Sequence, residues 1–140
     1  MTLVNNPNLV EELTQLYLRY EKALVENDLA VLDELFWESS DVVRFGATEN
    51  LYGILQIRQF RSDRPTHDLA RSISNLKVVT FGEDTAAITL EFQRTMNNVT
   101  RSGRQSQFWR KFPEGWKIVS AHVSLLPLEG NRPQLQSALA

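Results

Sequence analysis

The chain has 140 residues, with 17 acidic and 15 basic side chains and no cysteine. This length fits one domain with a single sizeable core. The lack of cysteine excludes disulfide frameworks, thiolate metal sites and a cysteine nucleophile. A net charge of -2 argues against nucleic acid as the main partner. No apolar run approaches the roughly 20 residues of a membrane span, and no signal-peptide pattern is visible. The sequence therefore predicts a soluble, cytoplasmic protein that makes no membrane contact.

Helical periodicity dominates the first part of the chain. A long amphipathic helix is predicted over about residues 8–27, capped by Asn6 or Asn8. A short helix follows Asp28, and a third is predicted over about residues 54–61, ended by Pro65. The apolar residues of the first helix fall on one inward stripe: Leu9, Leu13, Leu16, Tyr17, Tyr20 and Leu24.

After Pro65 the pattern changes to a period of two. Strands are predicted over about residues 71–81, 85–96, 101–112 and 116–125, and turn residues separate them. Helices first and long strands afterwards indicate an α+β fold. We expect three N-terminal helices on one face of a strongly curved antiparallel sheet, a cone-shaped fold whose open end encloses a small-molecule pocket. The domain is predicted to cover residues 1–126, followed by a loose tail over residues 127–140.

An arginine stands inside a short apolar strand, Val42-Val43-Arg44-Phe45-Gly46. Side chains alternate between faces along a strand, so Arg44 lies on the face opposite to Val43 and Phe45. Arginine is almost never buried without a partner. If Arg44 faces inward, it places a permanent cation in an apolar concavity, and this arrangement favours binding of an anion.

Polar side chains on the last two predicted strands are candidates for the pocket wall. Gln105, Gln107 and Trp109 share one face of the third long strand. On the last strand, the face that begins with Trp116 and Ile118 ends in polar residues, as expected for a strand running from core to cavity rim. The polar end of this face includes His122, which could instead be a core histidine with its hydrogen bonds satisfied or a dimer contact. The predicted substrate-binding residues are Gln107, Trp109, His122, Ser124, Arg61 and Arg71.

Common catalytic motifs are absent from the sequence. It contains no closely spaced histidine pair for a metal, no phosphate-binding glycine loop and no Gly-x-Ser-x-Gly elbow. The inward stripe of the first helix carries no carboxylate. Acid–base chemistry would then use tyrosine, histidine or a bound water, assisted by arginine. We expect Tyr17 to be ordinary core, whereas Tyr20 is a candidate partner of Arg44. No cofactor or metal is expected.

Several segments resemble a known family. The whole-chain pattern is similar to the SnoaL-like branch of the nuclear-transport-factor-2-like, or cystatin-like, superfamily. Within it, the closest resemblance is to small bacterial oxalurate-catabolism proteins and their relatives in cyanuric acid breakdown. The residues that carry it are Arg19-Tyr20-Glu21, Asn27-Asp28, Leu32-Asp33-Glu34-Leu35-Phe36-Trp37, Arg44-Phe45-Gly46, Glu49-Asn50-Leu51-Tyr52-Gly53, Phe60-Arg61, Gly103-Arg104-Gln105-Ser106-Gln107, Trp109, Gly115-Trp116 and Ala121-His122-Val123-Ser124.

The resemblance implies an amidohydrolase that converts dicarboxyurea to allophanate and accompanies an amidase acting on ureide-like compounds. A tyrosine and an arginine are essential in that family, and these roles map onto Tyr20 and Arg44. The segment Thr66-His67-Asp68 departs from the small residues usual there, which leaves the substrate open. The alternative is a non-catalytic module that binds a small carboxylate or serves a partner amidase. Isomerase or dehydratase chemistry is less favoured because no acidic base is evident.

The outward face of the predicted sheet suggests an assembly. It is more apolar than a solvated face needs to be, which predicts a homodimer formed through the outer faces of two sheets. The residues of this stripe are Phe108, Val119, Ala121 and Val123.

Overall fold

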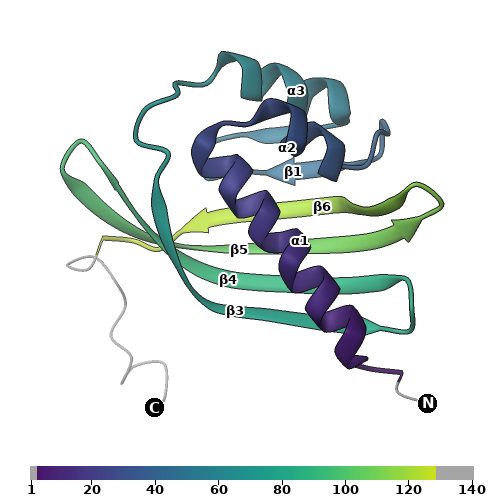
Figure 1. Cartoon of the computed structure of the whole chain (residues 1–140). Helices are drawn as coiled ribbons and strands as arrows, with labels where there is room; N and C mark the ends of the chain where they lie inside the picture. Colours follow the sequence, from purple (N-terminus) through teal and green to yellow (C-terminus); the bar gives the residue numbers. More distant parts are fainter. Residues whose placement is uncertain (1–2, 129–140) are drawn as a thin grey trace, which may run out of the picture.

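The computed structural model describes residues 3–128, and helices come before the long strands (Figure 1). The helices are α1 (Pro7–Glu26), α2 (Leu29–Leu35) and α3 (Ile54–Asp63). The strands are β1 (Val43–Phe45), β2 (Asn50–Tyr52), β3 (Arg71–Phe81), β4 (Thr85–Met96), β5 (Val99–Phe112) and β6 (Gly115–Leu125). Most of the tail predicted over residues 127–140 lies outside the described residues. None of the three helices is both long and apolar enough to pass through a membrane.

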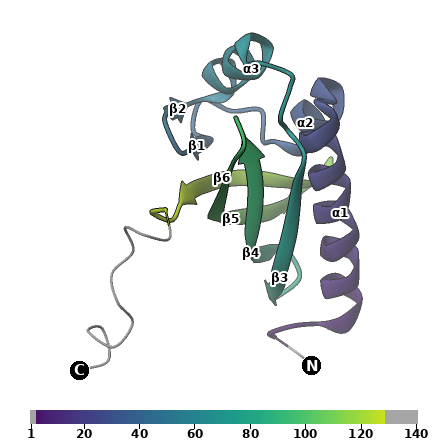
Figure 2. The same cartoon turned by 90° about the vertical axis from the view of Figure 1, so that its left-hand side faces the viewer.

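The strands form one six-stranded sheet in the order β2-β1-β6-β5-β4-β3, and the helices lie on its concave side (Figure 2). The predicted α+β architecture is therefore confirmed. One detail differs from the expected antiparallel meander, because β1 pairs with β6 in parallel. The chain enters β1 from α2 and leaves it through a hairpin to β2, so this small unit is added to the edge of the meander.

The N-terminal helix has the boundaries its sequence predicts to within one residue. The Asn6 side chain accepts hydrogen bonds from the main-chain nitrogens of Asn8 (3.0 Å) and Leu9 (3.4 Å) and so caps α1. The helix ends at Asn27, whose φ of 55° is in the left-handed region that terminates helices. Its inward stripe buries Leu13, Tyr17 and Tyr20 against the sheet.

Two extra residues disturb the regular pairing of the sheet. One lies in β3 near Asn75, which has a φ of 53°, where the pairing shifts between Ser74 and Lys77. The other is Val119 in β6, because Phe108 pairs with Ser120 whereas Trp109 pairs with Ile118. An extra residue bends a strand and increases its twist. These bulges therefore contribute to the curvature that leaves space between sheet and helices.

The bulge at Val119 also reverses the facing of every residue after it in β6. Ala121 is buried on the inner face, and Val123 lines the cavity described below, whereas both were predicted to face outward. His122 and Ser124 were predicted to face the cavity; instead they lie on the outer face, His122 against the Phe45 ring at 5.7 Å. These facing predictions were wrong because a strict period of two takes no account of an extra residue.

The outer face nevertheless keeps an apolar centre, and a homodimer stays our prediction. Phe108 is 42% exposed there. We expect light scattering at micromolar concentration to report a dimer, and Phe108→Glu to shift it toward monomer because a charge would be desolvated at the contact. Leu55→Glu is the matched control, since Leu55 is 75% exposed on α3, on the helical side of the sheet. A monomeric unsubstituted chain would contradict the prediction.

Candidate functional site

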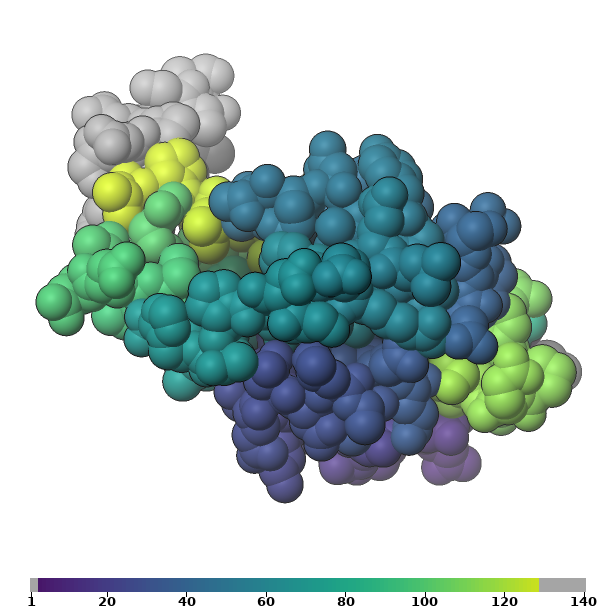
Figure 3. Space-filling view, turned by 90° about the horizontal axis from the view of Figure 1, so that it is seen from above, coloured from purple at the N-terminus to yellow at the C-terminus, as the bar shows by residue number. Residues whose placement is uncertain are grey.

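A cavity of about 380 Å³ lies between α3, the loop that follows it, and the inner face of the sheet. Seen from above, the surface is hollowed where the teal segment meets the green and yellow parts of the chain (Figure 3). Its wall combines apolar and charged groups. The apolar lining includes Leu24, Phe60, Leu69, Phe92, Met96, Val123 and Leu125; the ionisable lining residues are Arg44, Arg64, Arg71, Arg94, Arg101, His67, Glu49 and Asp68.

Arg44 faces inward, as predicted, and it already has an anionic partner. Its side chain donates from Nη1 to Glu49 Oε1 at 3.2 Å, and the residue is only 7% exposed. Its guanidinium carbon lies 5.4 Å from the centre of the Phe60 ring. The buried Nε of Arg44 has no hydrogen-bond partner within residues 3–128. The positive charge of Arg44 is therefore paired with a carboxylate of the same chain, while its buried Nε has no acceptor among the described residues.

Gly46 makes the pairing of Arg44 with Glu49 sterically possible. Its main-chain nitrogen donates to the Glu49 carbonyl at 2.9 Å and closes the turn between β1 and β2. A Cβ at position 46 would overlap the Glu49 carboxylate, so any larger residue would displace that group. Glu49 was not among the predicted site residues, although it belongs to a segment that carries the family resemblance. The clue to its role is its place in the sequence. Glu49 follows Arg44 by five residues, across a tight turn that brings β2 back alongside β1.

A second buried ion pair joins α1 to β3. Arg71 donates from Nη2 to Glu21 Oε1 at 2.7 Å and from Nε to Glu21 Oε2 at 2.8 Å. Tyr17 donates its hydroxyl to Glu21 at 2.8 Å, and Gln105 Oε1 accepts from Arg71 at 2.9 Å. The prediction that the inward stripe of the first helix carries no carboxylate is thus wrong, because Glu21 reaches this network from α1. Glu21 follows Tyr17 by one helical turn, and this spacing puts both side chains on one side of the helix.

Two members of this network, Tyr17 and Arg71, have a raised pKa. Burial raises the pKa of the Tyr17 phenol far above its ordinary value, so Tyr17 stays a hydrogen-bond donor. Burial acts to lower the pKa of Arg71, but the hydrogen bonds to Glu21 and the electrostatic effects of Glu21, Tyr17 and Tyr20 together outweigh it, so the net pKa is raised. Arg71 is therefore a permanent, compensated cation in the cavity wall.

Tyr20 is packed beside the cavity and does not line it. It is 1% exposed, and its ring centre lies 5.7 Å from that of Tyr17 and 6.2 Å from that of Phe36. In the described part of the chain its hydroxyl makes no hydrogen bond, including none to Arg44. The phenol instead interacts electrostatically with Arg61, Arg64 and Arg71. Its hydroxyl therefore lies in a cationic neighbourhood without a fixed partner.

Arg61 is a buried cation that forms no ion pair with any carboxylate of residues 3–128. It is 4% exposed, and neither terminal nitrogen has a hydrogen-bond partner among residues 3–128. Its guanidinium stacks 4.3 Å from the centre of the Phe36 ring. Burial, together with the neighbouring charges of Arg44 and Arg64, lowers the pKa of Arg61 to about 10. An arginine in this state favours any rearrangement or ligand that brings an anion near it.

Two buried glutamine amides add further unpartnered donors. Gln107 Oε1 accepts from Trp109 Nε1 at 2.9 Å, which leaves Gln107 Nε2 without a partner in the described chain. Gln105 Nε2 is likewise unpartnered. Buried polar groups in proteins are normally hydrogen-bonded. Because these free groups and Arg44 Nε are all N–H donors, the interior is suited to a ligand rich in acceptor oxygens.

The structure sorts the predicted site residues into three groups. Arg44 and Arg71 line the cavity. Tyr20, Arg61, Gln107 and Trp109 are buried but do not line it, and His122 and Ser124 lie on the opposite face of the sheet. The cavity residues that sequence analysis missed include Arg64, Arg94 and Arg101. Arg94 lies two residues after Phe92, and Arg101 lies two residues before Gly103. Each pair shares one face of its strand, so the period-two pattern carried a signal for both arginines. No cluster of three or more metal-ligating side chains occurs in the described residues.

Comparison with known proteins places this geometry in a family. The AtzH-like family profile matches residues 2–129. A crystal structure from Pectobacterium atrosepticum, a DUF3225-family protein of unknown function, is 50% identical, with a TM-score of 0.85 over 89% of this chain and 96% of that one. A cystatin-like fold protein from Burkholderia xenovorans is 38% identical, with a TM-score of 0.82 over 89% and 97%.

More distant structures share the fold alone. An NTF2-like protein of unknown function from Pseudomonas putida is 16% identical, with a TM-score of 0.75 over 91% of this chain and 94% of that one. No curated protein matches the chain significantly. The profile match over nearly the whole sequence, together with the inward arginine and the curved sheet, shows that the chain belongs to the AtzH-like family, on an NTF2-like, cystatin-like fold.

Proposed function

We propose that the cavity binds a small carboxylated ureide and hydrolyses one of its C–N bonds, as in the conversion of dicarboxyurea to allophanate. Water adds to a terminal carboxyl carbon, the bond from that carbon to nitrogen breaks, and the nitrogen gains a proton. The products are allophanate and bicarbonate. Membership of the AtzH-like family and the resemblance to ureide-catabolism proteins support this substrate class.

The observation that carries the proposal is the excess of cations in the cavity wall. Arg64, Arg94 and Arg101 line the cavity, and in the described chain none of them forms an ion pair with a carboxylate. Arg64 donates to the Asn27 side-chain oxygen at 3.2 Å, which leaves its charge uncompensated. Burial and the charge of Arg44 lower the pKa of Arg64. A carboxylated ligand would relieve both effects.

The residues around the cavity supply the roles that the reaction needs. Arg64 and the free Nε of Arg44 hold the substrate carboxylate and stabilise charge that develops during water addition. The Glu49 carboxylate, in the cavity wall, accepts a proton from the attacking water. The Tyr20 hydroxyl, which has no fixed protein partner, donates a proton to the leaving nitrogen, and solvent exchange returns both groups to their starting states.

The test is direct detection of products from dicarboxyurea generated in place by a partner amidase. Carbon-13 NMR would follow allophanate and bicarbonate in the presence and absence of the protein. We expect both products to appear faster with the protein. If ligand binds and the rate does not change, the hydrolase proposal is wrong.

A conservative change at Arg44 tests whether its planar guanidinium contacts Glu49 and the ligand at the same time. Arg44→Lys keeps the charge but cannot contact Glu49 and a ligand at once, so we expect about a tenfold loss of carboxylate affinity, measured by calorimetry. Arg19→Lys is the matched control, because Arg19 forms an exposed pair with Glu34 far from the cavity. Equal carboxylate affinity in Arg44→Lys and the unsubstituted protein would remove the bidentate role.

A second candidate function is a non-catalytic carboxylate-binding module that serves a partner amidase. The observations that favour it are the position of Tyr20 outside the cavity lining and the compensation of Arg44 by Glu49. Retained carboxylate binding without bicarbonate release would support this function over hydrolysis.

A further inference from the structure

We propose that a groove between α2 and α3 is a second binding site, separate from the cavity, and that it binds a small monocarboxylate through Arg61. The groove has a volume of about 310 Å³. Its lining residues are Leu29, Ala30 and Asp33 of α2, and Arg58, Arg61 and Ser62 of α3. None of these six residues lines the cavity described above. The inference goes beyond the proposed hydrolysis, because it concerns a different site.

The spacing of the lining residues along the two helices creates the groove. On α3, Arg61 and Ser62 follow Arg58 by three and four residues, which puts all three on one side of the helix. On α2, Leu29 and Asp33 are likewise one turn apart. The two helices lie next to each other (Figure 1), and Arg58 donates to both carboxylate oxygens of Asp33, at 2.5 and 3.1 Å. This ion pair holds the two walls of the groove together.

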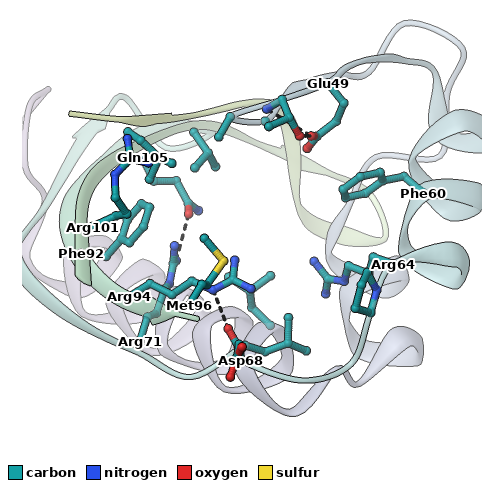
Figure 4. Close-up of a pocket in the computed structure, with 18 of the residues that line it drawn as sticks. Glu49, Phe60, Arg64, Asp68, Arg71, Phe92, Arg94, Met96, Arg101 and Gln105 are labelled. Carbon is teal, nitrogen blue, oxygen red and sulfur yellow. Dashed lines mark hydrogen bonds between the residues drawn. The ribbon is translucent and has the colours of Figure 1, made fainter. Parts of the chain in front are cut away.

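The α3 helix presents different side chains to the cavity and to the groove. Figure 4 shows Phe60 and Arg64 beside the open space of the cavity, and both line it. Arg61 directly follows Phe60, and consecutive residues of a helix point in directions about 100° apart. It therefore lines the groove and not the cavity. Sequence analysis assigned Arg61 to the substrate pocket, whereas the structure places it at this separate site.

Arg61 supplies the uncompensated charge of the groove. It is almost fully buried, and both of its terminal nitrogens lack a hydrogen-bond partner among residues 3–128. Arg58 and Asp33, by contrast, pair with each other, and Arg58 also binds Glu38. The charge of Asp33 acts to raise the pKa of Arg61, but burial outweighs it and the net pKa is lowered. The lining therefore carries one positive charge in excess, which one carboxylate would balance.

The shape and chemistry of the groove point to the ligand class. The planar guanidinium of an arginine matches the two oxygens of a carboxylate, which would supply the acceptors that Arg61 lacks. Leu29, which is 38% exposed, and Ala30 offer an apolar wall for a short alkyl chain. A second negative charge on the ligand would find no further unpaired cation among the lining residues. A short-chain monocarboxylate such as propionate combines these properties.

The experiment is a titration of the protein with propionate at constant ionic strength, followed by the amide NMR signals. We expect saturable shifts of residues 29–33 and 58–62. Ala30→Phe fills the groove with a ring, because Ala30 is exposed and lines it, and should weaken this binding by about tenfold or more. Arg61→Gln removes the charge and should weaken the binding to a similar extent. Thermal melts establish that each variant is folded, and either variant alone suffices for the comparison.

Ala47→Phe is the matched control, because Ala47 is also exposed but lines the cavity. It should bind propionate at the groove like the unsubstituted protein. Succinate and phosphate should bind there about tenfold more weakly than propionate, because their additional charge stays unpaired. The absence of saturable shifts in residues 29–33 and 58–62, unchanged propionate affinity in Ala30→Phe, or equally tight binding of succinate or phosphate would overturn the inference. Turnover of dicarboxyurea does not enter this comparison.

Discussion

Tyr20→Phe is expected to lower the rate of dicarboxyurea hydrolysis by about 10²–10⁴-fold, the usual contribution of a general acid–base group. The substitution removes one hydroxyl and keeps the ring between Tyr17 and Phe36. Because that hydroxyl makes no hydrogen bond within residues 3–128, its loss should change the free energy of unfolding by less than about 1 kcal/mol. The measurements are bicarbonate release and denaturant melts on the same samples.

Tyr17→Phe provides the opposite pattern and serves as the control. The Tyr17 hydroxyl donates to Glu21 at 2.8 Å and lies 3.3 Å from the Arg71 guanidinium, so its removal should cost about 1–3 kcal/mol of stability. Its effect on the chemical step should be smaller than that of Tyr20→Phe. If Tyr20→Phe keeps full activity, tyrosine has no part in the mechanism.

Glu21→Gln is expected to give a large loss of stability, about 3–5 kcal/mol, because it leaves a buried arginine charge uncompensated. The side chains of Arg71 and Glu21 are 5% and 13% exposed, so water cannot take over the role of the carboxylate. The change also leaves Arg71 beside its cross-strand neighbour Arg94 with no carboxylate of residues 3–128 paired to either. Urea unfolding monitored by tryptophan fluorescence would measure the loss.

Glu34→Gln is the matched control, because it makes the same change in an exposed pair. The side chains of Arg19 and Glu34 are 44% and 55% exposed. An exposed ion pair contributes only about 0–1 kcal/mol, so this variant should unfold almost like the unsubstituted protein. Similar losses in the two variants would show that burial does not set the strength of the Arg71–Glu21 interaction.

Local patterns in the sequence were sufficient for the helices, the strand around Arg44 and the four long strands, but not for β2. The stripe from Leu9 to Leu24 has helical spacing, and α1 occupies the predicted segment. The strands predicted over residues 71–81 and 85–96 have the same boundaries as β3 and β4, although an extra residue interrupts the alternation of β3. The inward direction of Arg44 also followed from alternation, since Val43 and Phe45 fix the other face. Each of these features depends only on residues close together in the chain.

The partners of the site residues were beyond such local reasoning. Arg71 and Glu21 are fifty residues apart, and only the packing of α1 on β3 brings them together. The alignment of Arg71, Arg94 and Arg101 across the sheet needs the register of three strands, which turn lengths alone leave open. The bulge in β6 has no sequence mark, because Val119 is an ordinary strand residue. For this reason His122 and Ser124 were assigned to the wrong face.

That single extra residue in β6 decides which side chains of the second half of the strand reach the cavity. If the same sequence paired with β5 without the bulge, every residue after Ile118 would change face, so the imidazole of His122 would turn toward the cavity and Val123 would turn outward. Deleting Val119 would not have this effect, because Ser120 would still stand opposite Phe108 and His122 would stay on the outer face. The bulge therefore keeps an apolar wall where an unbulged strand of identical sequence would present a titratable one.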